Sequence, residues 1–127
     1  MKFSIIAAAS ALIGCVTAAD QAVVINSCEK SIFVQSFPYD GGEPGALTTV
    51  KPGKEFSETL RSKGSVHEFS TEFGNPFAAN HNILSPGEGC EEFDCKADDA
   101  ECYSTPKHKK VYGCPQPVNL TAHICVK

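Results

Sequence analysis

The 127-residue chain contains no tryptophan, no excess of basic residues and only one long apolar run, and each shortage narrows the classes of protein to consider. Eleven lysines and arginines face fifteen aspartates and glutamates, so the formal net charge is -4. This acidic balance argues against nucleic acid and anionic membranes as partners, because both attract clustered basic residues. The absence of tryptophan removes the broadest aromatic platform for a sugar ring, so carbohydrate binding has little support.

The one apolar run lies at the start of the chain and has the order of an export signal. Lys2 provides a positive charge, residues 3–16 are apolar apart from two serines, and small residues follow at 17–19. The run is shorter than the ~20 residues that a membrane-spanning helix needs. We therefore expect a signal peptide at residues 1–19, one secreted domain at residues 20–127, and no membrane attachment.

Cysteine usage predicts how this domain is held together. One of the seven cysteines, Cys15, lies in the expected signal peptide, so an even number remains in the exported domain. These are Cys28, Cys90, Cys95, Cys102, Cys114 and Cys125. An even set in a short exported chain is read as a disulfide framework, and we expect three bridges that stabilise a modest core by roughly 3 kcal/mol each. Paired thiols leave no cysteine to act as a nucleophile.

Short alternating segments predict an all-β domain without a long amphipathic helix. The predicted strands are residues 22–25, 31–37, 47–50, 54–60, 65–69 and 118–126. We expect the first two to form a hairpin around the turn-prone Asn26-Ser27. The last is the clearest, because Leu120, Ala122 and Ile124 alternate with more polar residues and give that strand one apolar face for the core.

Residues 74–117 interrupt this strand pattern. They are rich in glycine, proline and acidic residues, and they contain four of the six exported cysteines. A loop of this length normally needs a constraint, which the disulfides would supply. We expect a cysteine-rich loop region with one helical turn at residues 96–101, and no second domain.

Several motifs resemble those of a known family of secreted proteins. Val24-Ile25-Asn26-Ser27-Cys28 precedes a strand, residues 47–53 are extended, and Glu68-Phe69-Ser70 is followed by Gly74-Asn75-Pro76-Phe77. With the later cysteine cluster and the terminal cysteine, these motifs resemble the small fungal proteins of the Blastomyces yeast-phase-specific family, which are similar in turn to a reduced thaumatin. The resemblance implies an all-β fold, namely a small disulfide-stabilised thaumatin-like β-sandwich with a cysteine-rich loop region. It also implies that the protein is exported from a fungus.

The resemblance also implies a disulfide between the first and last exported cysteines, Cys28 and Cys125. Both lie in or beside the terminal strands, which could be neighbours in a sheet. For the other four cysteines we favour Cys90 with Cys114 and Cys95 with Cys102, and the two other pairings stay open.

Larger thaumatin-like proteins have an acidic cleft, to which the motif Tyr-Asp-(Leu or Ile)-Ser-x-x-Asp-Gly contributes carboxylates. The matching residues here read His67-Glu68-Phe69-Ser70-Thr71-Glu72-Phe73-Gly74, so Glu68 stands at the first acid and Phe73 at the second. Glu72 is adjacent, but in an extended segment it points to the opposite face from Phe73. Because glycoside hydrolysis requires a pair of carboxylates, we take Glu68 and Glu72 as a candidate acidic cleft and expect no enzyme.

Three further patterns concern single sites. Asn119-Leu120-Thr121 fits the acceptor pattern for an N-linked glycan, and Asn119 would be accessible if its strand lies at an edge. Gly74-Asn75-Pro76-Phe77 predicts a tight turn that delivers Phe77 to the core, with a recognition tip as the alternative. The four histidines show no ligand-like short spacing, so we expect neither a metal nor a cofactor.

These observations favour a secreted, non-enzymatic fungal protein that acts extracellularly, as a monomer, as an effector-like or surface-interaction factor. The expected partner is a host extracellular protein or a cell-wall polysaccharide. A β-glucan-binding or weakly glucan-cleaving protein acting through Glu68 is the first alternative. An antimicrobial protein is the second, and the negative net charge disfavours it.

Overall fold

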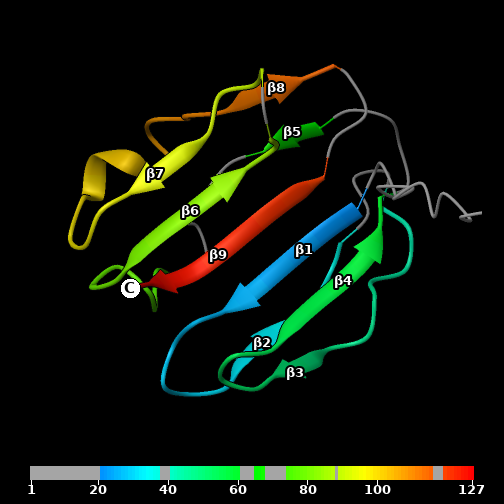
Figure 1. Ribbon diagram of the computed structural model, residues 1–127. Coiled ribbons are helices and arrows are strands. Elements are labelled where there is room, and N and C mark those ends of the chain that lie inside the picture. The colour runs from blue at the N-terminus through cyan, green and yellow to red at the C-terminus, as the bar shows by residue number, and fades with distance from the viewer. Residues whose placement is uncertain (1–20, 38–40, 61–64, 68–73, 88, 116–118) are drawn as a thin grey trace, which may run out of the picture.

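The part of the chain that the structure describes folds into short β-strands with one 3₁₀ turn (Figure 1). The computed structural model describes residues 21–37, 41–60, 65–67, 74–87, 89–115 and 119–127, so the expected signal peptide lies outside the described residues. The elements are β1 (Gln21–Asn26), β2 (Ile32–Val34), β3 (Thr48–Val50), β4 (Glu55–Thr59), β5 (Ser65–His67), β6 (His81–Ser85), β7 (Phe93–Cys95), η1 (Ala100–Cys102), β8 (Tyr112–Cys114) and β9 (Leu120–Val126). Within these ranges, no helix has the length and apolar character to cross a membrane.

Five strands form the main sheet in the order β4-β1-β9-β6-β7 (Figure 1). β1 lies parallel to β9 and antiparallel to β4, and β6 lies antiparallel to both β9 and β7. Residues 22–25 are apolar and mostly β-branched, which favours a strand. The sheet therefore brings the first and last strands together at its centre.

The predicted hairpin between residues 22–25 and 31–37 is wrong. β2 pairs with β3 in a separate two-stranded sheet, with Ile32 opposite Val50, while β1 pairs with β4 and β9. The buried Asn26 side chain explains the difference, because its amide donates to the Lys30 and Val50 carbonyls at 2.9 and 2.8 Å. These bonds hold a wide loop, and not a tight turn, between β1 of the main sheet and β2 of the two-stranded sheet.

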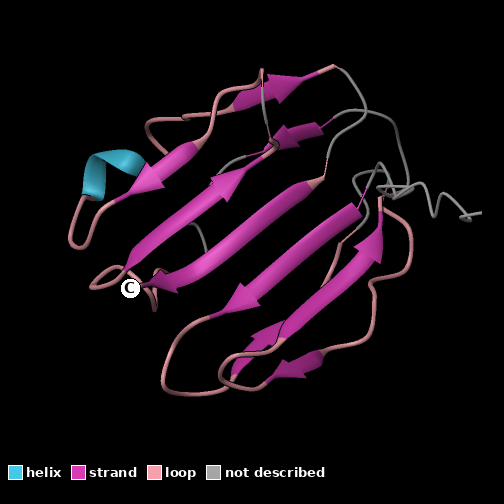
Figure 2. Ribbon diagram, in the orientation of Figure 1, coloured by secondary structure: helices cyan, strands magenta, loops and turns pink. Residues whose placement is uncertain are grey.

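Two small sheets, β2–β3 and β5–β8, complete the fold (Figure 2). Ile32 and Val50 of the first pack against Ile124 of β9, and Tyr112 of the second packs against a cluster that includes Phe93 of β7. The Phe93 and Tyr112 rings stack with their centroids 4.4 Å apart. Ala122 of β9 contacts both clusters, so the core runs continuously beneath the main sheet. The predicted small all-β fold is confirmed.

The segment 74–117 is more regular than its composition predicts. Its described residues contain β6, β7 and β8, and a turn of 3₁₀ helix lies at Ala100–Cys102 and not at residues 96–101. These strands are short and carry asparagine, cysteine and glycine, so propensity alone does not mark them. They form because neighbouring strands and disulfides hold them in place.

Three disulfides connect segments that are separated in the sequence. Cys28 pairs with Cys125 at a Cα–Cα distance of 5.0 Å, which ties the loop after β1 to the end of β9. Cys90–Cys114 spans 5.8 Å and joins the segment before β7 to β8, and Cys95–Cys102 spans 5.4 Å and closes the turn after β7. These are the pairs that the sequence analysis favoured, and they show a disulfide-stabilised fold.

Candidate functional site

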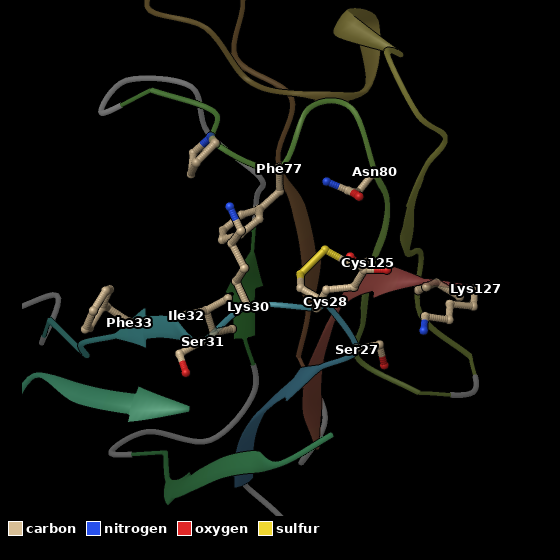
Figure 3. Close-up of a pocket in the computed structure, with 13 residues that line it drawn as sticks. Ser27, Cys28, Lys30, Ser31, Ile32, Phe33, Phe77, Asn80, Cys125 and Lys127 are labelled. Carbon is tan, nitrogen blue, oxygen red and sulfur yellow. A yellow bond between two sulfur atoms is a disulfide. The ribbon is translucent and has the colours of Figure 1, made fainter. Parts of the chain in front are cut away.

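An open pocket of about 730 Å³ lies where β9 ends, and we call it the terminal groove (Figure 3). It is lined by residues 27–33, 76–77, 80 and 125–127. Figure 3 shows the Cys28–Cys125 disulfide in the middle of the groove, with Phe77 on one side and Ile32 of β2 on another. The groove thus collects three segments that are distant in the sequence, and the disulfide joins two of them.

One wall of the terminal groove is the loop after β1, which Asn26 holds from behind. The Asn26 side chain is fully buried and accepts a hydrogen bond from the Cys28 N–H at 2.9 Å while its amide donates to the Lys30 carbonyl. Because a buried amide that loses its partners is costly, these bonds fix the loop conformation. The wall that contains Lys30 and Ser31 is therefore preformed.

The opposite wall is held in the same manner by Asn82 of β6. Its side chain is 1% exposed, and its amide nitrogen lies 2.9 Å from the Phe77 carbonyl and 2.9 Å from the Tyr103 hydroxyl. Its carboxamide oxygen accepts a hydrogen bond from the Cys125 N–H at 3.0 Å, and Cys125 has a positive φ of 58°. Asn82 thus links the turn that carries Phe77 to the end of β9.

Phe77 satisfies the predicted structural role and also reaches the groove. Its partly buried side chain packs against the cluster of Ile32, Val50 and Ile124, as expected of a core residue. It also lines the terminal groove, where the alternative of a recognition tip would place it. The turn ends with the Asn80 N–H donating to the Phe77 carbonyl at 2.9 Å.

Large apolar side chains are exposed on the β2–β3 side of the groove. Phe33, Phe37 and Leu47 are 70%, 71% and 65% exposed. Phe33 also lines the groove, so its ring extends the apolar surface from the groove onto the neighbouring hairpin. We call these three residues the exposed apolar patch. Where exposed apolar side chains form a contiguous surface, they commonly mark an interaction site.

A serine and a histidine meet at the edge of the groove. Ser27 Oγ lies 2.7 Å from His123 Nε2, and Ser27 lines the groove. A serine nucleophile requires such a base, together with a third group that orients the histidine. In the part of the chain that the structure describes, no carboxylate lies within ion-pair distance of His123. The contact joins the end of β1 to β9 without completing a triad.

A second polar cluster lies on the exposed surface between β6 and β7. His81 Nε2 is 2.5 Å from Asp94 Oδ1, and Lys96 Nζ is 3.0 Å from Asp94 Oδ2. The hydrogen bond from His81 and then that from Lys96 lower the pKa of the Asp94 carboxyl below its ordinary value. The group pairs two neighbouring strands at the surface, where such ion pairs contribute little to stability.

The residues predicted from the sequence are distributed unevenly around these sites. Glu68 and Glu72, the candidate acidic cleft, lie outside the described residues. Asn119 is exposed, at the opposite end of β9 from the groove. Among the described residues, no three histidine, cysteine or acidic side chains gather as a metal would require.

Sequence reasoning missed both buried asparagines. Asn26 was interpreted only as a turn residue, and Asn82 was not singled out. Asn82 could have been noticed because it stands next to the apolar Ile83-Leu84 in a strand. An amide that faces the core there needs several hydrogen-bond partners.

The fold and the groove together define a small, disulfide-stabilised all-β protein with a preformed surface groove. A family described as Blastomyces yeast-phase-specific protein matches residues 9–67 and 64–126, and the chain belongs to this family. It is also similar to the crystal structure of the protein elicitor MoHrip2 from Magnaporthe oryzae, with 43% sequence identity and a TM-score of 0.80. That similarity covers 85% of this chain and 100% of the other. Among curated proteins, none matches the chain.

Proposed function

We propose that this chain is a secreted, non-enzymatic fungal protein that acts outside the cell as an elicitor, a protein that provokes a response in the tissue it meets. The observation that supports this most directly is the similarity to a fungal protein elicitor at 43% identity over the whole of that chain. The three disulfides agree with an extracellular site of action, because such bonds persist in oxidising compartments. We include in this proposal that the fold is a thaumatin-like β-sandwich.

The terminal groove and the exposed apolar patch are the proposed contact surface for a protein of the responding tissue. Both walls of the groove are held by hydrogen bonds of the buried Asn26 and Asn82 side chains, so binding requires little ordering of the walls. Aromatic side chains such as Phe33 are frequent at the centre of protein interfaces. Mutation of this surface should therefore weaken the response without unfolding the protein.

Strand β2 suggests how the partner is engaged. Among the described strands, β2 pairs only with β3, and Figure 3 shows β2 between β3 and the turn that carries Phe77. An extended segment of a partner could pair with the other edge of β2, since added strands commonly bind in this way. The partner is then a protein with an exposed extended segment.

The test uses the protein recovered from culture medium and infiltrated into leaf tissue at graded doses. We expect a dose-dependent oxidative burst, and we expect Phe33→Ser to require roughly tenfold more protein for the same response, as the loss of an interface hot spot would predict. Val111, which is 43% exposed beside β8, offers the matched control Val111→Ser. This control should respond like the wild type.

Two outcomes would contradict the proposal. A wild-type protein that stays inside the producing cell, or that elicits nothing at any dose, removes the elicitor function. An active protein for which both variants behave like the wild type retains that function but removes the groove as its contact surface. Binding to insoluble β-glucan, measured in parallel, would identify a carbohydrate-directed protein.

A further inference from the structure

The sequon Asn119-Leu120-Thr121 lies at the entry to β9. Asn119 is exposed and immediately precedes the strand, whereas Thr121 lies within it, opposite Val23 of β1 and Ser85 of β6. Asn-x-Thr is the acceptor sequence for N-linked oligosaccharide in exported proteins. A glycan is bulky, so the acceptor side chain must face solvent in the folded protein, and Asn119 meets this requirement.

The hydrogen bonding of Asn119 directs Nδ2, the atom to which an N-linked glycan is attached, away from β1. The backbone N–H of Gln21 donates to Asn119 Oδ1 at 3.2 Å. Because a backbone N–H is a donor, the oxygen of the carboxamide must face β1, and this assignment directs Nδ2 away from it. A glycan attached through Nδ2 would therefore leave the bond to Gln21 intact.

We infer that Asn119 carries an N-linked oligosaccharide in the exported protein. In this reaction Nδ2 forms a bond to the anomeric carbon of the first sugar and loses a proton. The bond from that carbon to the diphosphate of a lipid-linked donor breaks, and the diphosphate leaves with the bonding electrons. Thr121 is half-buried between two strands once the sheet has formed, so the reaction takes place on the chain before β9 is in position.

The glycan would occupy the opposite end of the main sheet from the terminal groove. β9 runs from Leu120 to Val126, and a rise of ~3.3 Å per residue separates these ends by about 20 Å. Cys125 to Lys127 line the groove, whereas Asn119 lies beside the start of β1. The oligosaccharide therefore covers the end at which β1 and β9 begin and leaves the groove accessible.

The test measures intact mass before and after digestion with a peptide N-glycosidase, on protein secreted by yeast. We expect the wild type to be heavier than its polypeptide, with the excess removed by the enzyme and the Asn119 amide converted to a carboxylate. Asn119→Gln and Thr121→Val should both have the unmodified mass. Thr121→Ser keeps the hydroxyl of the sequon and is the matched control that should retain the glycan.

This inference rests on the proposed export, so the two are tested separately. One strain expresses the full chain with its own first 19 residues, and a second carries a yeast secretion leader ahead of residue 20. Failure of the first strain alone to secrete contradicts the export proposal. Unmodified wild-type protein in the medium of the second strain overturns the glycosylation inference. If both hold, enzymatic removal of the glycan should change the eliciting dose by less than twofold, because the glycan is remote from the groove.

Discussion

Asn82 offers the sharpest test of how the groove is built. We predict that Asn82→Leu, which has similar size but no hydrogen-bonding groups, greatly lowers the free energy of unfolding. The change leaves the Cys125 N–H, the Phe77 carbonyl and the Tyr103 hydroxyl each without one buried partner. The Phe77 carbonyl keeps the Asn80 N–H as a donor. At about 1–3 kcal/mol for each of the other two groups, the loss of stability amounts to roughly 2–6 kcal/mol. That is a large part of the 5–15 kcal/mol that typically stabilises a domain.

Urea unfolding of the purified variants, followed by far-ultraviolet circular dichroism, measures this loss. Asn119→Ala is the control, made in a host that adds no glycans, because it removes an amide that is exposed and bonded to Gln21 alone among the described contacts. It should cost less than about 1 kcal/mol. If Asn82→Leu lowered the free energy of unfolding by less than about 1 kcal/mol, Asn82 would not be the residue that links the turn carrying Phe77 to the end of β9.

The remaining predictions concern the disulfides and the surface ion pair. Replacing Cys28 and Cys125 by serine should destabilise the protein by about 2 kcal/mol more than replacing Cys95 and Cys102, because the first pair closes a loop of 97 residues and the second one of 7; equal losses in thermal unfolding would contradict this entropic argument. Asp94→Asn should cost less than about 1 kcal/mol at pH 7, since exposed pairs contribute little. The pKa of Asp94 is lowered in the folded state, so its contribution is present above the ordinary value near 4 and disappears as the pH falls through the lowered value. A difference from the wild type that grows on acidification would show that the sign is wrong.

The sequence predicts best where its periodicity is strong and local. The alternation of Leu120, Ala122 and Ile124 identifies β9 and its apolar face, and the core contacts agree with that assignment. The pairing partner of β1 could not be read in the same way, because strands 94 residues or more apart in the chain carry no local signal for each other. Adjacent segments were therefore joined into a hairpin that does not exist.

The groove could not be predicted because its walls depend on buried polar side chains. Asn26 and Asn82 occupy positions where an apolar residue would continue the strand pattern, and their roles become visible only when the distant partners are in place. Glycine and proline at the start of the turn before Phe77 did predict a fixed conformation. They did not indicate which other segments that turn would meet.

The Cys28–Cys125 bridge has a consequence for proteolysis of the chain. Any single cleavage of the backbone between these two positions yields two fragments, one containing Cys28 and the other Cys125. The fragments stay covalently joined, and the ends of the paired strands β1 and β9 remain tethered to each other. A nicked molecule would thus migrate as one species on a non-reducing gel, and reduction would separate it into two fragments.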